Sequence, residues 1–96
     1  MDRVEKEITI MNKQGLHARP AALFVQTAAK FDSSVKIRKD NDLVDGKSIM
    51  GILSLGVERG SKILLIVEGD DAHQALEELE RLLVSQEENI QGLNRV

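Results

Sequence analysis

Residues 61–68 read Ser-Lys-Ile-Leu-Leu-Ile-Val-Glu, and the five consecutive apolar residues at their centre are typical of a buried β-strand. The apolar run is also far shorter than the ~20 residues that a membrane-spanning helix needs. Gly69-Asp70-Asp71 follows the strand, and we expect it to end the strand and cap a helix. That helix is predicted from a stripe of apolar residues at helical spacing: Ala72, Ala75, Leu76, Leu79, Leu82 and Leu83.

Upstream of this stretch, the hydrophobic period distinguishes a strand from a helix. Residues 4–11 alternate between apolar and polar side chains, which predicts a strand with one face in solvent. From about Ala18 the apolar residues recur at helical spacing as far as Phe31. Pro20 fits the first turn of this helix, where its missing N–H costs little.

The middle of the chain predicts two short strands and a short helix. Residues 35–38 alternate again, and a turn leads to a short strand at 43–44. Ser48 is a favourable N-cap for an apolar helix over 49–55, which Gly56 closes.

The resulting element order is β-α-β-β-α-β-α. Strands with one apolar face and amphipathic helices predict an α+β open-faced sandwich, in which a four-stranded antiparallel sheet carries its helices on one face. We expect one domain over residues 1–85. Residues 86–96 lose the helical period, and we expect them to be a frayed tail.

Composition excludes several classes of function. The 96 residues include 13 Lys and Arg against 16 Asp and Glu, a net charge of −3, with only two aromatic residues. This argues against nucleic acid, whose binding needs a basic surface or aromatic platforms. With no Cys there is no disulfide or thiolate metal site, and the two histidines lie far apart, so no metal site is expected. The charged N-terminus is unlike a signal peptide, and we expect a cytoplasmic location and no membrane association.

One segment carries recognisable chemistry: Gly-Leu-His-Ala-Arg-Pro at 15–20. His17 lies immediately before the predicted helix, where unpaired backbone N–H groups favour an anion. The positive end of the helix favours a neutral imidazole, whose ring nitrogen can act as a nucleophile. Arg19 can turn its guanidinium towards phosphate oxygens. A nucleophile, an amide cradle and an Arg are the parts that phosphoryl transfer needs, although a loop histidine with a structural role is an alternative.

Two motifs together resemble the HPr family, the histidine-containing phosphocarriers of the bacterial phosphoenolpyruvate-dependent sugar phosphotransferase system. They are Gly-Leu-His-Ala-Arg-Pro-Ala at 15–21 and Lys-Ser-Ile-Met-Gly-Ile-Leu-Ser-Leu-Gly at 47–56, and the likeness runs from about Ile8 to Leu83. The resemblance implies the same open-faced sandwich and a phosphoryl carrier rather than an enzyme, without a cofactor. It implies that Enzyme I phosphorylates His17 on Nδ1, that Arg19 steadies the phosphate, and that enzyme II A components receive it.

The resemblance also implies regulation and docking. Ser48 matches the family's regulatory serine, which would bring in HPr kinase/phosphorylase and a catabolite-control transcription factor, although Ser48 can also be a cap alone. Asp45-Gly46 departs from the pattern expected of the family, because it places an acidic residue and a flexible hinge near Ser48. We expect a monomer, and the residues expected to dock its partners are Ala18, Ala22, Gln26, Ile49, Met50 and Leu53. Ile49, Met50 and Leu53 can instead be core residues of the short helix.

Other interpretations remain open at this stage. One is a regulatory interaction module of the nitrogen type or a co-repressor, which signals through its phosphorylation state. The intact His17 argues against a regulatory protein that works through Ser48 alone. Pro20 favours the sugar phosphotransferase branch of the family over the nitrogen-type branch. A small-molecule-binding domain lacks a polar cluster at a strand end. His73 is expected to be a surface residue.

Overall fold

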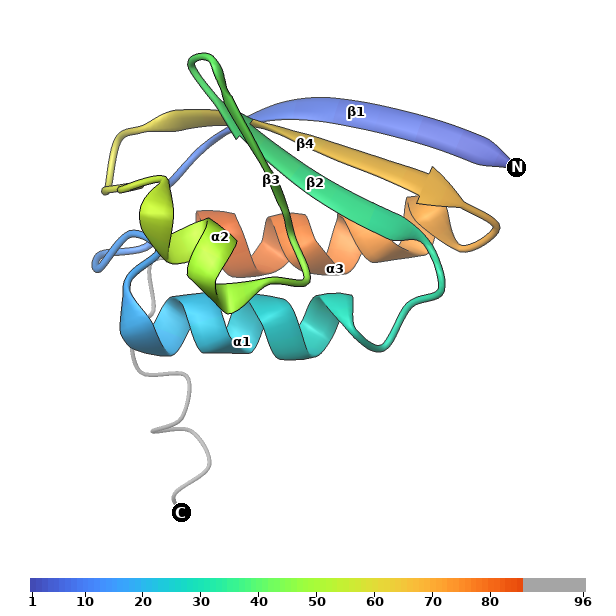
Figure 1. Cartoon of the computed structure of the whole chain (residues 1–96), viewed down its shortest axis with the longest axis horizontal. Coiled ribbons are helices and arrows are strands. Elements are labelled where there is room, and N and C mark those ends of the chain that lie inside the picture. Colours follow the sequence, from blue (N-terminus) through green and yellow to red (C-terminus); the bar gives the residue numbers. More distant parts are fainter. Residues whose placement is uncertain (86–96) are drawn as a thin grey trace.

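The computed structural model describes residues 1–85 of the 96-residue chain. Its four strands form one antiparallel sheet in the order β1-β4-β2-β3, and α1 and α3 lie beneath that sheet, leaving its other face uncovered (Figure 1). The predicted α+β open-faced sandwich and its element order are therefore confirmed. In chain order the elements are β1 (Asp2–Thr9), α1 (Ala18–Ala28), β2 (Ser34–Lys39), β3 (Asp42–Asp45), α2 (Ile49–Ser54), β4 (Lys62–Gly69) and α3 (Ala72–Val84).

Strand β4, which contains the apolar run, lies between β1 and β2. It pairs with β1 from Asp2 opposite Gly69 to Thr9 opposite Lys62. Its side chains alternate, so that Ile63, Leu65 and Val67 are buried against the helices while Leu64 and Ile66 are half-buried on the uncovered face. The apolar run thus supplies side chains to both faces of this central strand.

The core fills the space between the sheet and the helices. Phe24 is completely buried, and it packs with apolar residues from both layers. The apolar stripe predicted for α3 contributes four buried residues, and Leu76 and Leu82 pack against the core while partly exposed. The other buried core residues are Ile8, Ile10, Leu16, Ala21, Ala28, Phe31, Val35, Ile37, Ile52, Leu55 and Val57.

Most element boundaries differ from the predictions by one to three residues. Strand β1 begins at Asp2 and ends at Thr9, because its pairing with β4 extends over the charged N-terminus. Helix α1 ends at Ala28, before Phe31, which is buried from the following turn. Helix α2 ends one residue early, at Ser54. The predicted tail 86–96 lies outside the described residues.

Asp71 is the N-cap residue of α3, as predicted, but its side chain makes no capping hydrogen bond. Its carboxylate instead accepts hydrogen bonds from the backbone N–H groups of Asp32 and Ser33 and from the Ser33 hydroxyl. Ser33 is the one buried polar residue among the described part of the chain. These bonds fix the loop after α1 to the start of α3. The hydrogen bonds from the Ser33 hydroxyl and the Asp32 amide hold the pKa of Asp71 below its ordinary value of 3.8.

Replacing Asp71 tests this clamp. The pKa of the carboxyl is lower in the folded chain, so Asp71 stabilises the fold above its unfolded pKa and ceases to do so as pH falls through its folded pKa. We expect Asp71→Asn to lower Tm by a few degrees at neutral pH, and the difference from the unsubstituted protein to shrink as pH falls from about 5 to about 2. Thermal unfolding followed by circular dichroism measures both.

Asp70→Asn is the matched control, because Asp70 is an exposed neighbour with the same charge. It should leave Tm and its pH dependence almost unchanged. A difference between Asp71→Asn and the unsubstituted protein that is equally large at pH 7 and at about pH 2 would show that the carboxylate charge is not what holds the loop.

Candidate functional site

The loop between β1 and α1 is shaped by its own backbone. The Asn12 side chain accepts a hydrogen bond from the N–H of Gln14 at 3.0 Å, and the Asn12 carbonyl accepts one from Gly15 at 3.0 Å. Asn favours such turns because its side chain replaces a backbone partner. The loop therefore reverses direction before it reaches His17.

A second loop, between α2 and β4, packs against the first. The N–H of Leu16 donates to the Val57 carbonyl at 3.0 Å. Gly15 has a φ of +64°, and a Cβ atom there would lie only 2.4 Å from the Val57 carbonyl oxygen. Only glycine therefore allows this close approach. The second loop is held in turn by the N–H of Glu58, which donates to the Ser61 hydroxyl at 3.0 Å.

His17 occupies the N-cap position of α1, where its backbone is extended and its side chain makes no capping hydrogen bond. The N–H groups of Ala18 and Arg19 at this helix end have no carbonyl one turn back to bond, and Pro20 has no N–H at all. The first intrahelical bond runs from Ala21 to the His17 carbonyl at 2.8 Å. The exposed imidazole thus lies beside free amides at the positive end of a helix.

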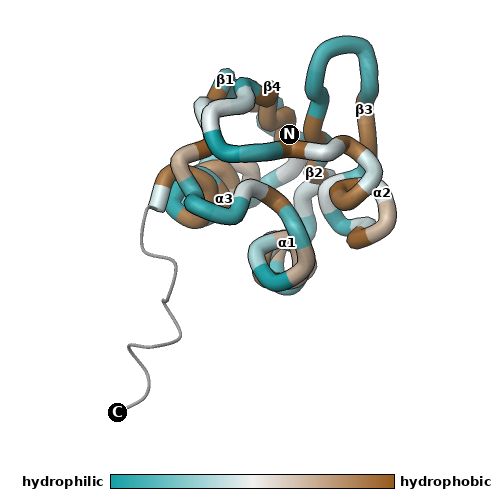
Figure 2. The backbone as a smooth tube through the Cα atoms, turned by 90° about the vertical axis from the view of Figure 1, so that its left-hand side faces the viewer, coloured by the Kyte–Doolittle hydropathy of each residue, from teal (hydrophilic) through white to brown (hydrophobic). Residues whose placement is uncertain are grey.

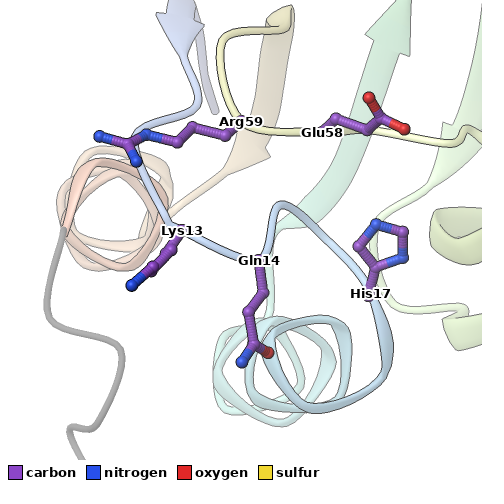
Figure 3. Close-up of a pocket in the computed structure, with 5 residues that line it drawn as sticks. All are labelled: Lys13, Gln14, His17, Glu58 and Arg59. Carbon is purple, nitrogen blue, oxygen red and sulfur yellow. The ribbon is translucent and has the colours of Figure 1, made fainter.

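The imidazole of His17 lines an open pocket of about 540 Å³ between the two loops. Figure 3 shows His17 and the Glu58 carboxylate on one side of this pocket and Lys13 and Arg59 on the other. Gln14 completes the lining. The pocket is thus lined by two cations and one carboxylate together with the histidine.

Sequence reasoning did not identify Lys13, Gln14, Glu58 or Arg59 as site residues. Lys13 lies four positions before His17, and this proximity was the only signal for it. Glu58 and Arg59 line the same pocket as His17 only because the two loops pack together. Arg19 is exposed in the first turn of α1 and is not among the residues that line the pocket.

Ser48 is confirmed as the N-cap of α2, because its hydroxyl accepts a hydrogen bond from the N–H of Gly51 at 3.1 Å. The preceding turn is held by Asp45, whose carboxylate accepts from the N–H of Lys47 at 2.9 Å. The Lys47 amine donates to the Phe31 carbonyl at 2.8 Å, so this side chain anchors the turn. The expectation of a flexible hinge was wrong: Gly46 is buried, and a Cβ there would lie 2.5 Å from the Val35 side chain.

The predicted docking residues come from two helices that pack together. On α1, Ala18 and Gln26 are exposed and Ala22 is partly buried. Figure 2 shows hydrophobic stretches on α2 beside β3. The exposed apolar residues of α2 are Met50 (74%), Leu53 (41%) and Ile49 (38%).

Leu23 of α1, which sequence reasoning did not select, is exposed to a similar extent, at 37%. We call the exposed apolar side chains of Leu23, Ile49, Met50 and Leu53 the apolar patch. Ile49 and Met50 of the patch directly follow Ser48, the N-cap of α2, so Ser48 lies at its border.

His73 is exposed on α3, as predicted, and its Nε2 lies 3.5 Å from the Asp2 carboxylate. No cluster of three or more His, Asp or Glu suited to a metal ion occurs within residues 1–85. The helices over the same residues are too short or too polar to cross a membrane.

Comparison with known proteins places this geometry in a family. The family model described as "PTS HPr component phosphorylation site" matches residues 4–85. The HPr-like protein Crh of Halalkalibacterium halodurans is 53% identical over 76 residues, which cover 79% of this chain and 90% of that protein.

Two solved structures show the same fold. The crystal structure of phosphocarrier protein HPr from Bacillus anthracis matches with a TM-score of 0.83 at 48% identity, covering 84% of this chain and 96% of that one. The crystal structure of Bacillus subtilis Crh, described as a dimer with a swapped domain, matches with a TM-score of 0.68 at 46% identity, covering 83% of this chain and 92% of that one. The chain therefore belongs to the HPr family of phosphocarrier proteins.

Proposed function

We propose that the chain is a phosphoryl carrier of the phosphoenolpyruvate-dependent sugar phosphotransferase system, and that His17 is the residue that carries the phosphoryl group. The observation that carries this proposal is the exposed imidazole of His17, which makes no capping bond and stands at the start of α1. A histidine with a purely structural role would use its ring nitrogens to bond the backbone. Here both ring nitrogens remain accessible to a donor and an acceptor protein.

The transfer step follows from this placement. The lone pair of Nδ1 of a neutral His17 attacks the phosphorus held by Enzyme I, the bond from phosphorus to the donor breaks, and the Nδ1–P bond forms while Nε2 keeps its proton. A second displacement passes the phosphoryl group to an enzyme II A component and restores the neutral ring. The chain is phosphorylated in the first step and dephosphorylated in the second, so it acts as a phosphoryl carrier rather than as an enzyme.

The surroundings of His17 favour a phosphate that is held and then released. The amides of Ala18 and Arg19 and the positive end of α1 stabilise negative charge on the ring. We propose that the Arg19 guanidinium turns towards the phosphate oxygens, because it is exposed and two residues away. Phosphoryl transfer depends mostly on positioning and charge, and these groups supply both.

The apolar patch is the proposed docking surface, together with Ala18, Ala22 and Gln26. Enzyme I and the II A components must each approach His17, and an apolar area next to it lets one surface serve several partners. Met50 is the most exposed member of the patch, and its flexible side chain suits partners of different shape. The proposed carrier works in the cytoplasm, as a monomer at the moment of transfer.

Ser48 is the proposed regulatory site. Its hydroxyl caps α2, so a phosphate there would lie at a helix start, where negative charge is tolerated. The same charge would border the apolar patch and would have to lose water when a partner docks. We therefore propose that HPr kinase/phosphorylase modifies Ser48 and thereby weakens docking without unfolding the protein.

A regulatory module is the second candidate function, because the chain is 53% identical to the HPr-like protein Crh over 76 residues. Such a module would act through its phosphorylation state on a transcription factor. The accessible His17 supports the carrier role, and the two roles are compatible in one chain.

Incubation with phosphoenolpyruvate and Enzyme I, followed by intact mass, tests the carrier role. We expect a gain of one phosphate that is labile to acid and stable to alkali, as a phosphoramidate is. His17→Ala should abolish it while the circular dichroism spectrum stays the same. His73→Ala is the matched control and should be phosphorylated normally. Labelling that survives in His17→Ala would refute the assignment.

The rate of phosphoryl transfer in the same reaction tests the role of Arg19. We expect Arg19→Ala to be phosphorylated but to transfer about 10-fold more slowly or worse, because one charged donor to the phosphate is lost. Arg3→Ala removes the same charge from β1 and should transfer at the normal rate. Equal rates for both variants would make Arg19 an ordinary surface residue.

Ser48→Asp tests the regulatory proposal by separating folding from docking. We expect nearly unchanged Tm but phosphate acceptance from Enzyme I at least about 10-fold slower, because a charge borders the apolar patch. Ser48→Ala should do the reverse, losing up to ~1 kcal/mol of capping while it keeps transfer fast.

The control is Gln74→Asp, which adds the same charge at an exposed position on α3 rather than on α1 or α2. It should transfer like the unsubstituted protein. If Ser48→Asp also transferred at that rate, Ser48 would be a cap and no more.

A further inference from the structure

The uncovered face of the sheet carries three neighbouring columns of side chains that differ in charge. The register places Glu7 opposite Leu64 and Leu64 opposite Arg38 in one row. The next row of the face joins Glu5, Ile66 and Lys36 in the same way. An acidic column on β1 and a basic column on β2 therefore flank an apolar column on β4, and no helix within residues 1–85 lies on this face (Figure 1).

These charges have few partners within the fold. Arg3 binds the Glu5 carboxylate at 2.6 Å and lies 3.7 Å from that of Glu68, at one end of the face. Within residues 1–85, no ion pair is formed by Glu7, Lys36 or Arg38, and all three side chains are exposed. The half-buried Leu64 and Ile66 lie between them.

We propose that this face binds the same face of a second copy of the chain, with the two-fold axis along β4. Rotation about that axis brings the acidic column of each copy over the basic column of the other. Glu7 then faces Arg38 of the second copy, while Leu64 faces Leu64. A two-fold interface must be complementary to itself, and columns of opposite sign on either side of an apolar column satisfy that requirement.

The charge order also selects the orientation. A two-fold axis across the strands would place β1 over β1 and so bring Glu5 and Glu7 against the same acids of the second copy. Like charges opposed in this way are unfavourable. With the axis along β4, the two sheets run in nearly the same direction, which is the aligned packing of β-sandwiches.

The size of the face makes this a weak dimer. Three strands about 4.8 Å apart, two of eight residues and one of six, cover roughly 350 Å² on each copy. Stable interfaces bury about 800 Å² per partner, so we expect a dissociation constant on the order of 10⁻⁴ M. The helices lie on the other side of the sheet (Figure 1), and His17 is the N-cap residue of α1, so the dimer leaves the proposed carrier site open and does not depend on it.

Sedimentation equilibrium of the full chain, from about 10 μM to about 1 mM at low salt, tests the proposal. We expect Glu7→Lys alone and Arg38→Glu alone each to raise the dissociation constant about 10-fold or more, because each sets like charges face to face twice. An equimolar mixture of the two variants should associate again, since position 7 of each chain then faces an opposite charge at position 38 of the other. The double variant should also dimerise, for the same reason.

Glu77→Lys, a charge reversal on the exposed side of α3, is the control and should leave dimerisation unchanged. Restoration by mixing cannot come from changes inside one chain, so it would establish the paired columns. A protein that stays monomeric to about 1 mM would overturn the proposal. Dimerisation that both single variants retain, which is what a dimer with a swapped strand would show, would also overturn the proposal. A mixture of the two variants that fails to associate would overturn it as well.

Discussion

The hydrogen bond from the N–H of Leu16 to the Val57 carbonyl joins the two loops on which the site depends. It forms because Gly15 takes a left-handed conformation and brings no Cβ against the Val57 carbonyl. All five pocket residues come from these two loops: Lys13, Gln14 and His17 from the first, and Glu58 and Arg59 from the second. The chemistry of the site therefore rests on a backbone contact that no other residue at position 15 allows.

The pairing of β1 with β4 in the sheet brings these loops together. One loop leaves the end of β1 and the other enters β4, and those strands are paired neighbours. The pairing continues past the strands, because the N–H of Ile10 donates to the Ser61 carbonyl at 2.8 Å. At the other end of α1, the carboxylate of Asp71 holds the loop that contains Ser33. Polar contacts thus fix both ends of the helix that presents His17.

Much of the fold could be predicted from local patterns. The apolar run in β4, the alternation in β1 and β2 and the helical spacing in α1 and α3 indicated the order of elements, because each depends only on near neighbours in sequence. The capping role of Ser48 was equally local. The strand order, and with it the columns on the uncovered face, depends on register, which a single sequence does not reveal.

The site was predictable only in part for the same reason. His17 was identified from its local motif, whereas Glu58 and Arg59 line the same pocket only through the pairing of β1 with β4. Arg19, predicted from the same motif, is not among the residues that line the pocket and stays a prediction. Asp71 was assigned to the wrong partner, because its hydrogen bonds span almost 40 residues of sequence. The Lys47 side chain likewise has a distant partner, the Phe31 carbonyl. Contacts between distant residues were the ones missed.

The most direct test of the central claim is NMR of the phosphorylated protein. Phosphorus–nitrogen couplings identify the nitrogen that carries the phosphate, and amide shifts report which backbone groups surround it. The account predicts a coupling to Nδ1 of His17, with amide shifts concentrated at residues 12–19 and 57–60. A coupling to His73, or amide shifts spread away from these two loops and the start of α1, would contradict it.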